Sequence, residues 1–178
     1  YVVCTVSGTG ISAGTAAKFN NANTYSIAAS YDSTAQKIVI VYSDGGNNNY
    51  GTALVGTISG TSMSFGSAVV FSGTSYVSST SVSYDSTNNK TFVFFDKADS
   101  AATGIIATVS GTSISFGSES TLTSGNVAYV NSTFDSSAGK ALVVYKDIGN
   151  SSYGTLFAVD TTFATGNFTS ENYIGISR

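Results

Sequence analysis

Histidine and proline are absent from the 178 residues, and Cys4 is the one cysteine. Without histidine, the chain can form neither a Ser-His-Asp triad nor a histidine-ligated metal site. A lone cysteine excludes an internal disulfide, and the valines at positions 2, 3 and 6 predict that Cys4 is a small core residue. Because average usage would give about nine prolines, edge strands here lack one common blocking device.

Charge is also scarce. Charged residues make up 10% of the chain, with seven Lys and Arg against ten Asp and Glu and a formal net charge of −3, whereas an ordinary domain has about 25%. The basic residues are scattered, which argues against nucleic acid as a partner because phosphate binding needs clustered Lys and Arg. No apolar run reaches about 18 residues, so we expect no membrane insertion.

Apolar residues supply 42% of the sequence and aromatic residues 12%, and Ser, Thr, Gly, Asn and Tyr carry its polarity. Thr and Tyr suit pleated, half-exposed surfaces. Apolar residues alternate with polar ones, so the chain is expected to bury a core and not to be disordered. The composition therefore favours a β-protein.

Internal repetition is the most informative feature of the chain. The triplet Ser7-Gly8-Thr9 recurs at positions 59 and 110, spacings of 52 and 51 residues. Further repeated positions are held by the same residue type in three copies: Asp32, Asp85 and Asp135; Lys37, Lys90 and Lys140; Asp44, Asp96 and Asp147; Gly51, Gly104 and Gly154. A period of this length with strand-like content is typical of propeller blades or stacked sheets.

Each repeat reads as four antiparallel strands joined by short turns. In the middle copy we expect strands at about 77–84, 90–95, 104–110 and 113–118. The second strand of each copy is apolar nearly throughout, which predicts burial on both faces. The first strand is rich in small residues, as suits the crowded centre of a propeller. No useful 3.6-residue apolar period occurs, so helix content should be near zero.

The predicted fold class is all-β: tandem four-stranded antiparallel meanders in a β-propeller-like array of about three and a half blades. Residues 1–21 would form a half blade, and 23–73, 75–123 and 126–178 the full blades. A β-solenoid or a tandem β-sandwich is the alternative. Because the chain begins and ends within the repeat pattern, we expect a segment of a longer polypeptide, forming one repeat domain.

The repeated Asp32, Asp85 and Asp135 start the turn between the first and second strands. A short carboxylate at such a position accepts hydrogen bonds from backbone amides two residues on, so we expect a structural role. One carboxylate without a nearby second ligand is too little for Ca²⁺, so no metal site is predicted.

Two loops after the second strand are the candidate ligand sites. Both are rich in Asn or Ser and end in Tyr-Gly, and the middle copy has neither Asn nor Tyr there. Asp and Asn can bond sugar hydroxyls, and Tyr offers a flat apolar face. The alternative is a structural turn in which Asn and Gly adopt positive φ and Tyr packs on the next blade. The candidates are Asp44, Asn47, Asn49, Tyr50, Asp147, Asn150 and Tyr153, and the links at 20–24, 72–75 and 123–127 would share their face.

The segments Thr-Ile-Ser-Gly-Thr-Ser-Met-Ser-Phe-Gly-Ser (57–67) and Thr-Val-Ser-Gly-Thr-Ser-Ile-Ser-Phe-Gly-Ser (108–118) carry a resemblance. They resemble repeats in tail-fibre-like and other virion proteins of marine bacteriophages, over roughly residues 1–160. The resemblance implies a propeller-like, extracellular or virion-surface module that engages host glycans or builds a fibre. It carries over no catalytic residue.

The first functional hypothesis is therefore a non-enzymatic adhesion module of a phage virion that binds a cell-surface polysaccharide. The alternatives are a structural spacer or coat component, a secreted bacterial lectin and a glycan-cleaving tailspike. No cofactor is implied. Unpaired strand edges at both ends predict association with a second copy or with other virion proteins.

Overall fold

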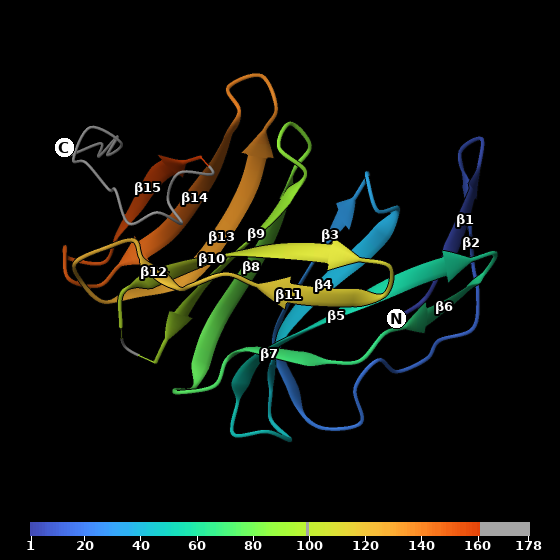
Figure 1. Cartoon of the computed structure of the whole chain (residues 1–178), viewed down its shortest axis with the longest axis horizontal. Coiled ribbons are helices and arrows are strands. Elements are labelled where there is room, and N and C mark those ends of the chain that lie inside the picture. Colours follow the sequence, from blue (N-terminus) through green and yellow to red (C-terminus); the bar gives the residue numbers. More distant parts are fainter. Residues whose placement is uncertain (99, 161–178) are drawn as a thin grey trace.

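The computed structural model describes residues 1–98 and 100–160, and these form fifteen β-strands in antiparallel sheets with no helix (Figure 1). The all-β prediction is confirmed. A hairpin of β1 (Cys4–Ser7) and β2 (Gly10–Ala13) comes first. No sheet closes into a barrel.

Three larger sheets follow, one per repeat. The first sheet contains β3 (Thr24–Asp32), β4 (Lys37–Asp44), β5 (Tyr50–Ser59), β6 (Ser62–Phe65) and β7 (Val69–Ser72). The second contains β8 (Val77–Asp85), β9 (Lys90–Lys97), β10 (Ala102–Ser110), β11 (Ser113–Phe116) and β12 (Ser120–Thr121). The third contains β13 (Val127–Asp135), β14 (Lys140–Asp147) and β15 (Tyr153–Val159). The part of the predicted last blade beyond residue 160 lies outside the described residues.

The three sheets have the same register. The repeated Asp pairs with the repeated Lys across the first hairpin in each: Asp32 with Lys37, Asp85 with Lys90 and Asp135 with Lys140. Each first strand also carries a β-bulge near its start, which adds twist to the strand. The three turns after these first strands all project from one side of the molecule, the top of Figure 1.

The predicted fourth strand is divided into two pieces that both pair with the third strand, β6 with β7 in the first sheet and β11 with β12 in the second. Gly66 and Gly117 follow the first piece in each. A methyl group on Gly66 would lie 1.9 Å from the carbonyl oxygen of Thr112 in the second sheet. Glycine is required there because the neighbouring backbone leaves no room for a side chain.

Neighbouring sheets pack face to face around two apolar cores. One core joins the first and second sheets and includes Val39, Val41, Val93 and Phe95. The other joins the second and third sheets and includes Phe92, Phe94, Ala141 and Val143. Side chains alternate between the two faces of a strand, so β9 supplies one set of aromatic residues to each core. The continuous apolar run in β9 follows from this position.

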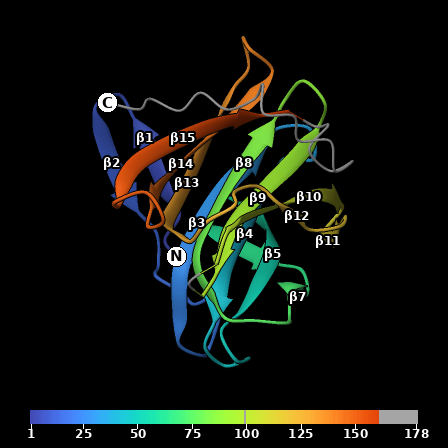
Figure 2. The ribbon, with the colours of Figure 1, turned by 90° about the vertical axis from the view of Figure 1, so that its left-hand side faces the viewer.

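The first strands lie side by side, with β8 between β3 and β13 (Figure 2). The amide of Thr80 donates a hydrogen bond of 2.6 Å to Oγ of Ser26, and the amide of Val130 donates one of 3.1 Å to Oγ of Ser79. Ser26 and Ser79 both stand six residues before the repeated Asp, and Thr80 and Val130 both stand five before it. The same bond therefore recurs at both junctions.

The burial of the second strands differs between sheets. β4 and β9 are buried along most of their length, as predicted, but β14 alternates between buried and exposed residues. The prediction of burial on both faces is wrong for β14, because no described sheet covers its outer side. The prediction for Cys4 is also wrong: its side chain is exposed, since β1 and β2 have only one packed face.

The β1–β2 hairpin stands before the first sheet as β5–β6 stands before the second. The amide of Gly14 donates to the carbonyl oxygen of Val3, that of Gly66 to Val55 and that of Gly117 to Ile106, each at 2.9 Å. A third apolar cluster, centred on Ile40, Tyr42 and Leu54, lies on this side of the first sheet. Phe19 packs edge-on against Tyr42 in it.

Candidate functional site

The three repeated Asp residues at the hairpin turns are structural, as the sequence predicted. Oδ1 of Asp85 accepts hydrogen bonds from the amides of Thr87 (2.8 Å) and Asn88 (3.0 Å). Asp32 and Asp135 hold the equivalent amides in the same way. Within the described residues no group of three His, Cys, Asp or Glu side chains is placed to hold a metal ion.

The first candidate loop, between β4 and β5, is built by its own hydrogen bonds. Oδ1 of Asp44 accepts from the amide of Gly46 and from Nδ2 of Asn20, both at 3.0 Å. The carbonyl oxygen of Asp44 accepts from the amides of Asn47 and Asn49, both at 2.9 Å. Asn48 and Asn49 have φ of 53° and 56°, a left-handed conformation that Asn tolerates.

The end of this first loop joins two sheets. The amide of Val77, at the start of β8, donates to the carbonyl oxygen of Asn49 at 3.0 Å. Oγ of Ser43 donates to the same oxygen at 3.1 Å. Tyr50 is half-buried. Asn49 and Tyr50 therefore have the structural role that was the alternative to ligand binding.

The loop of the middle copy serves the same structural purpose. The amide of Val127, at the start of β13, donates to the carbonyl oxygen of Ser100 at 3.1 Å, as Val77 does to Asn49. The carboxylate of Asp96 is buried and accepts from both the amide and the hydroxyl of Ser79. No free carboxylate is left at the start of this loop.

The third candidate loop, between β14 and β15, repeats the local bonds of the first but is more open. The amide of Asn150 donates to Oδ1 of Asp147 at 3.1 Å, and the amide of Tyr153 donates to the carbonyl oxygen of Asn150 at 3.1 Å. Ser151 and Ser152 have positive φ. The side chain of Tyr153 is 58% exposed.

Each of these loops lies against the link that precedes the first strand of its own sheet. The amides of Gly45, Ala98 and Ile148 donate to the carbonyl oxygens of Asn23, Tyr76 and Asn126, at 2.8, 2.9 and 2.9 Å. The structure thus brings the predicted loops and links together in all three repeats. It does not combine the first and third loops into one site, because each belongs to its own sheet.

A hollow is present at the third loop and is filled at the first. At the third loop, a volume of about 230 Å³ is lined by Thr123, Ser124, Gly125, Asp147, Gly149 and Asn150. Gly125 takes the place that Ala22 has in the first repeat. A methyl group on Gly46 would lie 2.6 Å from Cβ of Ala22, whereas one on the equivalent Gly149 would have nothing closer than 3.5 Å. The exchange of Ala22 for Gly125 therefore opens the hollow.

Two further hollows escaped the sequence analysis. One, of about 510 Å³, lies on the open face of the third sheet beside Tyr129 and Val144. The other, of about 390 Å³, lies on the open side of the first sheet beside Tyr31 and Ile58. Both exist because these faces have no neighbouring sheet, which the residue pattern of a repeat does not reveal.

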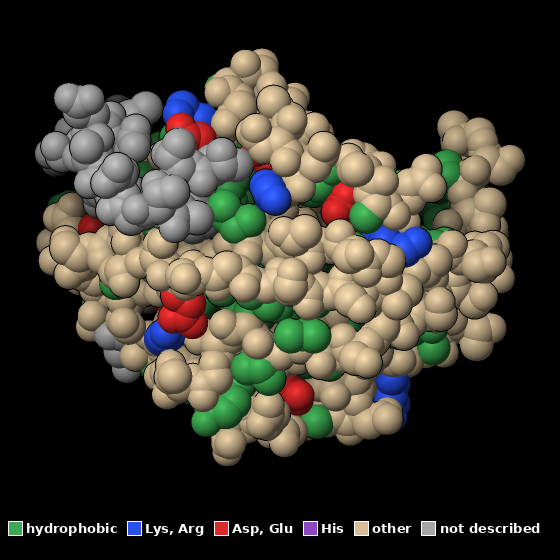
Figure 3. Space-filling model, viewed as in Figure 1, with side chains coloured by type: hydrophobic (Ala, Val, Ile, Leu, Met, Phe, Trp, Pro, Cys, Tyr) green, Lys and Arg blue, Asp and Glu red, His purple; other side chains and the backbone are tan. Residues whose placement is uncertain are grey.

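Charge does not gather at any of these places. On the face shown in Figure 3, the Asp, Glu, Lys and Arg side chains are dispersed among neutral polar ones. The described ion pairs include Lys97 with Glu119, and Lys140 with Asp160 at 3.1 Å. The helices that could cross a membrane are absent from the described ranges, which contain no helix at all.

No protein-family model, curated protein or solved structure matches this chain.

Proposed function

We propose that the chain is a non-enzymatic module that binds a polyhydroxylated ligand, a cell-surface glycan, in the hollow beside Asp147. The observation that carries the proposal is this hollow of about 230 Å³. It is smaller than the roughly 300–1,000 Å³ of pockets for drug-sized ligands, so it suits a single sugar residue at the end or edge of a chain.

The chemistry of the lining supports a sugar. Thr123 and Ser124 offer hydroxyl groups, Asn150 an amide and Asp147 a carboxylate, and such groups pair with the alternating donors and acceptors of a sugar. Gly125 and Gly149 let a ring approach the backbone. The exposed Tyr153 follows the same loop and supplies an apolar surface for a neighbouring sugar ring.

The proposed architecture is a β-propeller-like array with the three sheets as blades. The side-by-side first strands and the recurring bond between them support a radial arrangement. Hydrogen-bonded ladders stay within each described sheet, whereas a β-solenoid would pair its strands from one repeat to the next. A placement on a virion surface, among copies of itself or other virion proteins, is proposed from the resemblance of residues 57–67 and 108–118 to phage repeats.

A role without catalysis agrees with how the carboxylates are used. Asp32, Asp85 and Asp135 close turns, and Asp44 and Asp96 hold loop and strand amides. A glycosidase needs two carboxyl groups that face each other across a sugar at about 5–9.5 Å.

A structural spacer is the second candidate function, and the first loop favours it. Its Asp44 and Asn49 are engaged in holding the link 20–24 and the start of β8. A chain in which all three loops served only to join sheets would have no use for the hollow at the third.

A glycan array probed with the purified chain tests the proposal. We expect binding to a subset of surface polysaccharides, reduced at least tenfold by Asn150→Ala. Asn47→Ala is the matched control, because Asn47 has the same place in the first loop, where Ala22 fills the space; it should leave binding unchanged. An array that stays blank favours the spacer, and release of reducing sugar from a bound polysaccharide indicates an enzyme.

A further inference from the structure

The open side of the first sheet has the form of a site with a missing half. The β1–β2 hairpin takes the place that the third and fourth strands of a preceding sheet would have. A methyl group on Gly14 would lie 3.0 Å from the carbonyl oxygen of Thr61, and the equivalent Gly66 makes the same approach to Thr112. The place of a first and a second strand beside β1 holds no strand of the described chain.

The edge of β1 that faces this place has no described partner. The equivalent strand β5 pairs with β6 on one edge and with β4 on the other, and β10 pairs with β11 and β9 in the same way. β1 pairs with β2 alone. Its free backbone donors and acceptors are a template for one more antiparallel strand.

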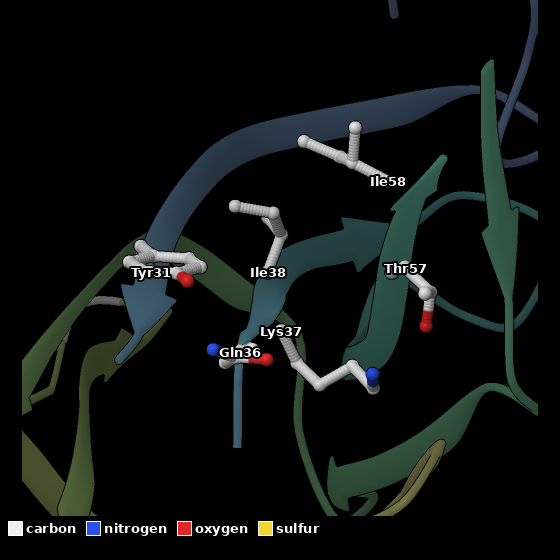
Figure 4. A pocket seen from close by; sticks show the side chains of 7 residues that line it. Tyr31, Gln36, Lys37, Ile38, Thr57 and Ile58 are labelled. Atoms are coloured by element: carbon white, nitrogen blue, oxygen red, sulfur yellow. The ribbon is translucent and has the colours of Figure 1, made fainter. Parts of the chain in front are cut away.

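The inner part of the first sheet is apolar and exposed where its counterparts are buried. The side chain of Tyr31 is 53% exposed, whereas the equivalent Tyr84 in the second sheet is 9% exposed. Ile27 is exposed too, while the equivalent Thr80 and Val130 are buried. Figure 4 shows Tyr31, Ile38 and Ile58 gathered around the hollow of about 390 Å³ on this side.

We propose that this recess, bounded by the edge of β1 and by Ile27, Tyr31 and Ile38, is a docking site for a two-stranded β-hairpin of the same repeat presented by another protein chain. The hairpin has a first strand of small residues, an Asp turn and a second strand that begins with Lys and continues with apolar residues. Its second strand pairs with β1, and its first strand lies beside β3.

The junction between the first and second sheets shows what such a hairpin would meet. The hydroxyl of Tyr84 donates to Oγ1 of Thr34 at 2.7 Å, and Thr34 stands two residues after the turn Asp of the preceding sheet. The hydroxyl of Tyr31 has the same bond available to the residue at that place in the docked hairpin. The contact that covers Tyr84 thus specifies a contact that covers Tyr31.

A second copy of this chain is a poorer occupant than a chain with a free hairpin. The second strands β4, β9 and β14 each pair with a strand on both edges. A copy would have to break one of its own ladders to lend a hairpin to β1. A partner that carries an unengaged repeat hairpin loses nothing in this way.

A synthetic peptide with the sequence of residues 126–147 is the probe, with a scrambled peptide as control. It carries Leu142 and Val144, which are exposed in the chain itself, and Ser137 at the place of Thr34. Fluorescence anisotropy of the labelled peptide should show saturable one-to-one binding, and Tyr31→Glu should weaken it at least tenfold. Tyr129→Glu, at an exposed aromatic residue of the third sheet, should leave it unchanged. Hydrogen exchange of the β1 amides should slow when the peptide binds.

Three results would overturn the proposal. They are the absence of saturable binding, binding that Tyr31→Glu leaves intact, and binding without protection of β1. Sedimentation equilibrium of the chain alone decides the remaining case: association that Tyr31→Glu abolishes would make a second copy the occupant. Gly125→Ala, which fills the hollow at the third loop, should not affect the peptide, so failure of this proposal is distinguishable from failure of the glycan proposal.

Discussion

Val41 and Val144 occupy the same position in their repeats, four residues after the repeated Lys, yet Val41 is fully buried and Val144 is 45% exposed. Val41 lies in the core between the first and second sheets. Val144 points from β14 to the side that no described sheet covers. One repeat position therefore has two environments, set by whether a neighbouring sheet follows.

This difference predicts unequal effects of the same substitution. Val41→Ala removes two buried methyl groups and leaves a cavity, so the free energy of unfolding should fall by about 2–3 kcal/mol. Val144→Ala should change it by less than about 0.5 kcal/mol. Urea unfolding of the two variants compares the values, and equal losses would contradict the described packing.

The tyrosines at positions 84 and 31 provide a second matched pair. Tyr84→Phe removes the hydroxyl that donates to Thr34 at 2.7 Å and to Oδ1 of Asn89 at 3.1 Å. The loss should cost about 0.5–1.5 kcal/mol, whereas Tyr31→Phe should be neutral within about 0.5 kcal/mol. Thermal unfolding followed by circular dichroism measures both, and a neutral Tyr84→Phe would argue against this junction.

Gly66 and Gly117 are equivalent glycines with opposite expected behaviour. Gly66→Ala places a methyl group against the carbonyl oxygen of Thr112, so the sheets must shift and the free energy of unfolding should fall by about 1–3 kcal/mol. A methyl group on Gly117 would be 3.7 Å from its nearest neighbour. Gly117→Ala should therefore be neutral or stabilising by up to about 1 kcal/mol. The order of the two melting temperatures tests this.

Asp135 predicts a pH dependence at the third turn. Hydrogen bonds from the hydroxyl of Ser137 and from the amides of Ala138 and Ser137 hold the pKa of Asp135 below its ordinary value of 3.8. Because the pKa is lower in the folded state, the stabilisation is present above pH 3.8 and is lost as the pH falls through the folded pKa. Titration of side-chain carboxyl signals by NMR measures it, and Asp135→Asn should remove this part of the acid dependence. A pKa at or above 3.8 would contradict the bonding of this turn.

Gly125→Ala tests the hollow without disturbing the fold. A methyl group on Gly125 meets no atom within 4 Å, so the variant should fold with wild-type stability. It should bind any glycan found on the array at least tenfold more weakly, because the methyl group enters the space that the sugar occupies. Unchanged glycan binding would place the site elsewhere.

The repeat pattern predicted the strands and their register because those depend on local sequence. The alternation in each third strand and the Asp at each first turn recur with the period and form the same bonds in the structure. The division of the fourth strand was not predicted, since the role of Gly66 depends on the backbone of Thr112 in the next sheet.

Coverage of the sheets was beyond the sequence for a similar reason. Leu142 and Val144 have the pattern of a buried strand, and only the absence of a described neighbouring sheet exposes them. The candidate loops were placed correctly beside their links. The contrast between a filled and an open loop depends on one methyl group, at Ala22 against Gly125, and its effect appears only when the link and the loop are seen together.

The central claim is that successive repeats meet through their first strands by the same contact at each junction. Nuclear Overhauser effects on the isotope-labelled chain test it most directly. The account predicts cross-peaks from the amide of Thr80 to the β-protons of Ser26 and from the amide of Val130 to those of Ser79. Absence of both cross-peaks in a folded chain, with the ladders within each sheet intact, would contradict it.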